Sequence, residues 1–178
     1  MLALDRPTPS FVEFLQCAAS ELGLADHSRN TWIHQTKGML NDIGILTVPH
    51  FFINIYDMNT LLYNNDHDPF NKKTLRALSK GAFTIMGPGH KPPSLIEMLR
   101  KAAVEIKPQE DRREPWCQES YSRLRDIGIF QVQDLVIQVL EINTKLRELH
   151  KLEFPQTQLL KMLNATFDLL YIIYWAKS

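Results

Sequence analysis

The sequence predicts an all-α protein made of two tandem 84-residue units, each with four helices. When the chain is aligned with itself at an offset of 84, residues 9–92 pair with residues 93–176 without a gap, and 22 of the 84 pairs are identical. Within each copy the apolar residues recur at helical spacing, and polar or glycine- and proline-containing steps separate the helical segments. A self-similarity at a fixed period indicates that each copy is one structural unit.

This offset predicts the domain organisation. Residues 1–8 form an N-terminal extension, residues 9–92 the first repeat, and residues 93–178 the second repeat with an apolar C-terminal helix. The chain is 44% hydrophobic, which is enough for a core, and its 20 basic and 20 acidic residues cancel. Cys17 and Cys117 occupy different repeat positions and indicate no disulfide. We expect an intracellular protein without a membrane span, soluble or peripheral in an assembly.

The first helix of each repeat opens with a capping box, a Ser followed three residues later by a Glu. Ser10 with Glu13 and Ser94 with Glu97 can satisfy free backbone N–H groups of the first turn. Each helix then carries two adjacent alanines, which favour close packing against another helix: Ala18 and Ala19, and Ala102 and Ala103.

The second helix is expected to begin at Trp32 and Trp116 and to end before Gly44 and Gly128. Glycine adopts the left-handed conformation that stops a helix without a steric penalty. The two tryptophans have two interpretations, a plug in the core or a platform for a ligand, and the first is more common for a large aromatic residue.

A third helix follows in each copy, with one apolar face. These faces comprise Val48, Phe51, Phe52, Ile55, Met58 and Leu62, and Val132, Leu135, Val136, Val139, Ile142 and Leu146. Asn59 and Asn143 recur within it, each followed by Thr. A buried amide needs hydrogen-bond partners, so each Asn either fixes the following loop through backbone groups or belongs to a duplicated polar site.

The fourth helix should start near Phe70 and Phe154, and here the copies differ. The first copy ends in residues 87–93, a Gly- and Pro-rich joint, whereas the second continues as an apolar segment over residues 169–175. A helix that is apolar on all sides must be covered, either by the rest of the protein or by a partner. If a partner covers it, the predicted partner-binding residues are Leu169, Tyr171, Tyr174 and Trp175.

The segments 42–45 and 126–129 both read Asp-Ile-Gly-Ile, and the turn with its flanking helices resembles helix-hairpin-helix modules. The wider pattern of Leu, Gly-Ile, Val and Phe or Leu is similar to sterile alpha motif domains. The first resemblance implies phosphate binding at Gly44 and Gly128, and the second implies a helical bundle that associates with proteins. The residues after both turns contain no Lys or Arg, which binding to a phosphate backbone requires.

The duplication also bears on chemistry, because none of the six histidines recurs in the other copy. Residues 66–68, Asp-His-Asp, could be imagined as metal ligands, but their repeat counterpart has no such pattern and a solvated loop is favoured. No phosphate loop, nucleophile turn or Cys-His arrangement is present. We therefore predict no catalytic residue, metal or cofactor, and no small-molecule substrate is indicated.

These observations predict a non-catalytic protein-binding scaffold or a structural subunit of a larger assembly, with one or more protein partners. The alternative is a nucleic-acid-binding protein that uses its two Ile-Gly-Ile turns. The neutral charge balance and the missing basic residues make nucleic acid the less expected partner.

Overall fold

The computed structural model describes residues 10–86 and 91–176, and the side chains of the last helix as far as Leu170. The described residues form α-helices and two short 3-10 helices but no strand, which confirms the all-α class. The chain divides into two compact units, Met1–Ile85 and Met86–Ser178.

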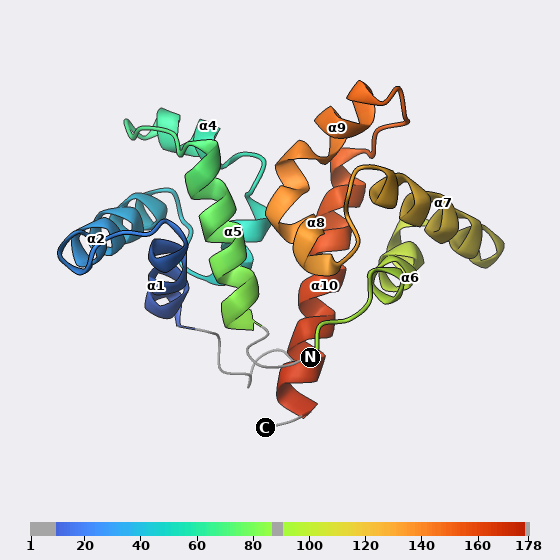
Figure 1. Cartoon of the computed structure of the whole chain (residues 1–178), viewed down its shortest axis with the longest axis horizontal. Helices are drawn as coiled ribbons and strands as arrows, with labels where there is room; N and C mark the ends of the chain where they lie inside the picture. Colours follow the sequence, from blue (N-terminus) through green and yellow to red (C-terminus); the bar gives the residue numbers. More distant parts are fainter. Residues whose placement is uncertain (1–9, 87–90, 177–178) are drawn as a thin grey trace. The chain divides into compact units, whose positions relative to one another are not determined.

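The described residues of the first unit form five helices, which Figure 1 shows in blue to green. They are α1 (Phe11–Glu21), α2 (Asp26–Asp42), α3 (Val48–Ile53), α4 (Met58–Asn64) and α5 (Lys72–Met86), the last ending at the unit boundary. Helix α1 packs against α2. It also lies very close to α5, since a Cβ atom added to Gly81 of α5 would come within 2.9 Å of the backbone nitrogen of Ala18. The close contact expected at this alanine is therefore present.

The described residues of the second unit form five α-helices, which Figure 1 shows, and two short 3-10 helices. They are α6 (Leu95–Ile106), η1 (Glu110–Arg112), α7 (Arg113–Asp126), α8 (Val132–Gln138), η2 (Val139–Glu141), α9 (Ile142–Glu148) and α10 (Gln156–Ala176). Helix α6 packs against both α7 and α10, and α10 also contacts α8. No helix in the described residues is long and apolar enough to cross a membrane.

The helix boundaries recur along the chain. Helices α1, α3, α4 and α5 each begin 84 positions before α6, α8, α9 and α10 respectively. Helices α2 and α7 end 84 positions apart, at Asp42 and Asp126. Their starts differ because the residues equivalent to the first turn of α2 form the 3-10 helix η1 in the second unit.

Both glycines of the Ile-Gly-Ile turns adopt the left-handed conformation that was predicted for them. The φ angle is +82° at Gly44 and +84° at Gly128. The next residue then donates its N–H to a carbonyl five positions earlier, from Ile45 to Leu40 at 2.8 Å and from Ile129 to Leu124 at 2.9 Å. This is the hydrogen-bond pattern of a glycine helix stop.

The expected third helix is divided in two in both units, so its continuity was wrongly predicted. All the apolar residues assigned to its inner face are buried, but α3 ends at Ile53 and α4 starts at Met58. The Asn54 side chain donates to the carbonyl of His50 at 2.9 Å, and such local bonds compete with helix propagation. In the second unit η2 occupies the corresponding break.

The second helices also begin earlier than predicted. Helix α2 starts at Asp26 and α7 at Arg113, before Trp32 and Trp116. Neither start has a side-chain cap among the described contacts, since Ala25 and Arg112 precede them. The sequence therefore lacked the polar cap that would have marked these boundaries. Trp116 is buried, and Trp32 is partly exposed.

In each unit one asparagine joins the fourth α-helix to the residues just before the fifth. Phe70 donates its N–H to the Asn59 side chain at 2.8 Å, and the Asn59 amide donates to the Phe70 carbonyl at 3.0 Å. Asn143 and Phe154 form the same two bonds, at 2.8 and 2.7 Å. Both asparagines thus fix the following loop, as one of the two interpretations predicted.

Two further kinds of polar contact occur in both units, each at positions 84 residues apart. The first is made by an arginine. Arg29 donates to the carbonyl of Leu24 at 3.4 Å, and Arg113 donates to the carbonyl of Pro108 at 3.2 Å, so each arginine holds the loop between the first two helices of its unit.

The second kind of contact joins the end of the second α-helix of each unit to the loop that follows the fourth. Asp42 lies 2.9 Å from the His67 ring nitrogen, and Asp126 lies 2.8 Å from the Lys151 ammonium. His67, in the loop after α4, therefore has a structural partner in Asp42 at the end of α2. Among the described residues no group of three His, Cys, Asp or Glu could hold a metal ion.

Candidate docking pocket

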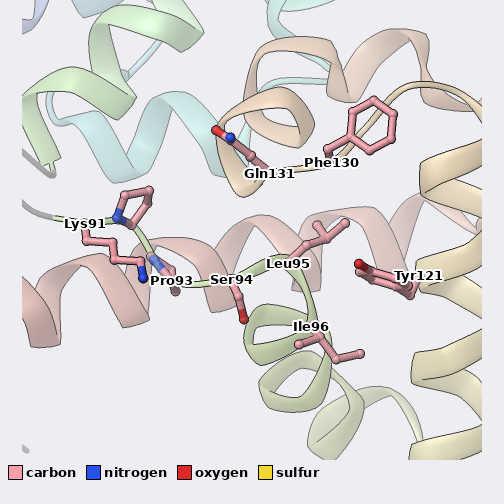
Figure 2. A pocket seen from close by; sticks show the side chains of 9 residues that line it. Lys91, Pro93, Ser94, Leu95, Ile96, Tyr121, Phe130 and Gln131 are labelled. Atoms are coloured by element: carbon pink, nitrogen blue, oxygen red, sulfur yellow. The ribbon is translucent and has the colours of Figure 1, made fainter.

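The described part of the second unit contains a surface pocket of about 390 Å³ beside the start of α6 (Figure 2). Three segments supply its lining. These are residues 91–96, which lead into α6, Tyr121 on α7, and Phe130 with Gln131 in the link to α8. Lys91 and Pro93 lie at one side of the pocket and Tyr121 at the other (Figure 2).

A complete capping box fixes the α6 side of the pocket. The Glu97 backbone N–H donates to the Ser94 hydroxyl at 3.2 Å, and the Ser94 backbone N–H donates to the Glu97 carboxylate at 3.2 Å. In α1 only the first of these bonds forms among the described residues, from Glu13 to Ser10 at 3.4 Å. The two-sided box holds the chain entering α6 in one direction, which places Ile96 at the pocket.

The opposite wall depends on the glycine turn. Because Gly128 reverses the chain and Ile129 enters the core, Phe130 is directed outward and leaves 54% of its surface exposed. The Asp134 carboxylate accepts from the backbone N–H groups of Phe130 and Gln131, both at 3.1 Å. A backbone held by two such bonds keeps Phe130 at the pocket.

Arg125 lies between the two aromatic side chains of the pocket. Its guanidinium carbon is 5.4 Å from the centroid of the Tyr121 ring and 5.2 Å from that of the Phe130 ring. It also donates to the Tyr121 hydroxyl at 2.9 Å. A guanidinium held over two rings is a preorganised cation, and the Arg125 side chain is exposed.

The corresponding surface of the first unit differs in chemistry. Leu46 lies 84 positions before Phe130 in the sequence and is 57% exposed. The positions equivalent to Tyr121 and Arg125 hold Lys37 and Asn41. His50 replaces the Asp134 cap, and its ring nitrogen lies 3.4 Å from the backbone nitrogen of Leu46. Both units thus expose a large apolar residue after the glycine turn, and only the second has the arginine between two rings.

The partner-binding residues predicted from the sequence lie at the end of α10, away from these lining residues in sequence. Leu169 is partly buried on that helix. The side chains of Tyr171, Tyr174 and Trp175 lie outside the described residues, so the choice between core and partner contact stays a prediction.

Sequence reasoning did not find Tyr121, Arg125 and Phe130 as one cluster. Tyr121 and Arg125 are four residues apart on one helix, which places them on the same face, and this spacing was an available signal. The contact with Phe130 requires the chain reversal at Gly128, and a one-dimensional pattern does not show which side chain returns to which helix face.

The pKa values of both cysteine thiols are raised by their surroundings. Burial raises the pKa of the Cys117 thiol, assisted by the nearby Glu114 carboxylate. Burial also raises the pKa of Cys17, with Glu13 and Glu21 acting in the same direction. A raised thiol pKa is the opposite of what an activated nucleophile needs.

The chain matches no protein-family model, no curated protein and no solved structure.

Proposed function

We propose that this protein is a non-catalytic protein-binding scaffold, or a structural subunit of an assembly, built from two copies of one helical unit. The copies share four of their five α-helix starts at an offset of 84, left-handed glycines at Gly44 and Gly128, and the asparagine contacts of Asn59 and Asn143. A duplicated unit offers two related surfaces that can diverge in partner preference.

One observation carries the binding proposal. Leu46 and Phe130, at equivalent positions after the glycine turns, are 57% and 54% exposed. Val12 and Ile96, also at equivalent positions, are exposed and partly exposed, and Ile96 lines the same pocket as Phe130. Covering exposed apolar surface stabilises a complex by about 25 cal/mol per Å² before the costs of association. Exposed apolar residues that recur at equivalent positions of the two units therefore favour protein partners.

The recurring polar residues form contacts within their own unit, which supports a structural role for them. The exposed apolar residues are therefore the better candidates for partner binding. Asn143 holds Phe154, Arg113 holds the preceding loop, and Asp126 pairs with Lys151. Each of these groups is occupied by contacts that define the unit. The aromatic end of α10, with Leu169, Tyr171, Tyr174 and Trp175, remains a second proposed contact for a partner.

The nucleic-acid alternative would use the backbone at Gly44 and Gly128. One basic side chain, Arg125, lies beside the second of these turns, and Asn41 occupies its place at the first. The exposed residues that directly follow the two turns, Leu46 and Phe130, are apolar, so a protein surface fits them better than a phosphate backbone does.

Site-specific photo-crosslinking of the full chain tests the proposed function. A photoreactive phenylalanine analogue is placed at position 46 or 130, and at the exposed control position 104 in the same chain background. After crosslinking in an extract of the native source, a protein recovered from positions 46 or 130 but not 104 is produced separately. Its affinity is then measured against Leu46→Ser and Phe130→Ser.

The proposal expects at least one such partner whose binding weakens about tenfold in one of these variants. Crosslinks that are the same at all three positions would contradict it. So would a partner whose affinity neither variant changes.

A further inference from the structure

The pocket beside α6 has the dimensions of a site for one side chain with its neighbouring backbone. Its volume of about 390 Å³ lies in the range of ligand-binding pockets. Pro93 and Leu95 are buried, and Ile96, Tyr121 and Phe130 add apolar or aromatic surface. An apolar or aromatic side chain is therefore the fitting occupant of its interior.

Two basic side chains lie at the pocket: Lys91 belongs to its lining, and Arg125 lies at the rings of the lining residues Tyr121 and Phe130. In the described part of the chain neither Lys91 nor Arg125 forms a salt bridge, and Lys91 is exposed. Glu97 and Asp134, which follow the lining segments in the chain, accept hydrogen bonds from backbone N–H groups at the starts of α6 and α8, and Asp126 pairs with Lys151. Two cations without a carboxylate partner favour an acidic ligand.

Arg125 adds directional specificity to this charge. Its guanidinium is held by the Tyr121 hydroxyl and by two ring faces, so little side-chain entropy is lost when it binds a carboxylate. Arginine binds carboxylates through paired N–H groups more strongly than neutral donors do. The cation and the apolar pocket share Tyr121 and Phe130, so one ligand segment can reach both.

We propose that this pocket binds an acidic linear peptide segment of a partner protein, with an apolar or aromatic side chain next to Asp or Glu. The inference rests on the proposed scaffold function and names its ligand chemistry. It applies to the second unit alone, because Lys37 and Asn41 replace Tyr121 and Arg125 in the first. The two copies thus differ in the partners that they select.

The test selects peptides from a displayed library of random segments of about twelve residues, with the full chain as bait. We expect enrichment of Asp or Glu beside Phe, Trp, Tyr or Leu. A fluorescein-labelled synthetic peptide with the enriched sequence then gives the dissociation constant by fluorescence anisotropy. Raising the salt concentration from about 0.05 to 0.5 M should weaken binding.

Two variants and two matched controls localise the binding. Arg125→Gln and Phe130→Ser should each raise the dissociation constant about tenfold or more. Arg112→Gln removes another exposed arginine and Val104→Ser another exposed apolar side chain, and both should leave it within about twofold. Circular dichroism of each variant checks that the helices are retained.

The proposal is overturned if no peptide is enriched, if the enriched sequences are basic, or if the controls weaken binding as much as the pocket variants do. Stronger binding of a DNA duplex than of the enriched peptide also overturns it. If position 130 crosslinks to a partner but the selection gives no acidic sequence, the scaffold function stands and only the ligand chemistry is wrong. If neither position 46 nor position 130 gives a specific crosslink, the scaffold function itself fails.

Discussion

Asn143 holds the main chain of Phe154 with both polar atoms of its side-chain amide: Oδ1 accepts from the Phe154 N–H at 2.8 Å, and Nδ2 donates to the Phe154 carbonyl at 2.7 Å. Phe154 is buried, and the Arg123 guanidinium lies 3.9 Å from its ring centroid. One side chain therefore satisfies a donor and an acceptor of a backbone that leads into α10. Asn59 does the same for Phe70 before α5.

Replacement of Asn143 by alanine should lower the free energy of unfolding by about 1–3 kcal/mol, because a part-buried backbone donor and acceptor lose their partners. Asn59→Ala should act in the same direction. Urea denaturation followed by circular dichroism measures the change. Asn164→Ala, at an exposed position of α10, is the control and should stay within about 0.5 kcal/mol. Equal losses in all three variants would contradict the specific role of the two asparagines.

Alanine at Gly44 or Gly128 should destabilise the protein by about 1–2 kcal/mol, because a Cβ atom is disfavoured at the positive φ of both residues. Gly38→Ala is the matched control. Gly38 lies inside α2 with open space around its Cβ position, so the substitution should stabilise the helix by about 0.5–1 kcal/mol. Thermal or urea unfolding would show opposite signs for the turn and the helix, and equal signs would refute this account.

Gly81→Ala should cost about 1–3 kcal/mol, although alanine is the better helix former. The added methyl group would meet the Ala18 nitrogen at 2.9 Å and the Phe14 carbonyl oxygen at 3.1 Å, so α1 and α5 would have to shift. Gly38→Ala again provides a glycine-to-alanine change without a close contact. If Gly81→Ala stabilises the protein as Gly38→Ala does, the close contact between α1 and α5 is wrong.

The two thiols should react slowly in the folded protein. Cys117 is 1% exposed, and its pKa is raised by burial, so little thiolate forms near neutral pH. Ellman's reagent at about pH 8 should therefore titrate Cys117 in the Cys17→Ser variant only after the protein unfolds. Titration in concentrated guanidinium chloride supplies the fully reactive reference. Rapid reaction of the native variant would show that Cys117 is accessible.

The Arg100–Glu114 contact should make a small, pH-dependent contribution to stability. Hydrogen bonds from Arg100 at 3.3 and 3.0 Å, and one from Gln118, lower the pKa of the Glu114 carboxyl below its ordinary value of 4.5. Because the pKa is lower in the folded state, the contribution is present above the ordinary value and is lost as pH falls through the lowered value.

The urea midpoint of Glu114→Gln should therefore lie slightly below that of the parent at about pH 7 and approach it in acid. Glu119→Gln, which changes another exposed carboxylate of α7, is the control. A Glu114→Gln difference that grows as the pH falls would contradict the assigned sign.

The order of the helices and the core residues could be predicted from the sequence because their signals are local. The capping box at Ser94, the left-handed stop at Gly128 and the buried face of α8 each depend on residues within a few positions of one another. The break between α3 and α4 was missed because apolar spacing continues across it. Side-chain competition by Asn54 leaves no periodic signal.

The pocket could not be predicted for a different reason. It combines residues 91–96 with Tyr121 and Phe130, which lie more than 20 positions further along the chain. Only the packing of α7 against α6 brings them together. The alignment of the chain with itself at an offset of 84 carries a partial signal, since Leu46 and Phe130 are both apolar beside a turn, but exposure is a property of the folded unit.

The asparagine contacts have a consequence for how this protein can change over time. Asn143 joins residues eleven positions apart, so the start of α10 is held whatever sequence lies between them. Lengthening a surface loop adds only about 0.6 kcal/mol per doubling. The loop tips between α4 and α5 and between α9 and α10 are therefore the places where insertions would be tolerated, and where related chains would vary most in length while the helices on either side stay in register.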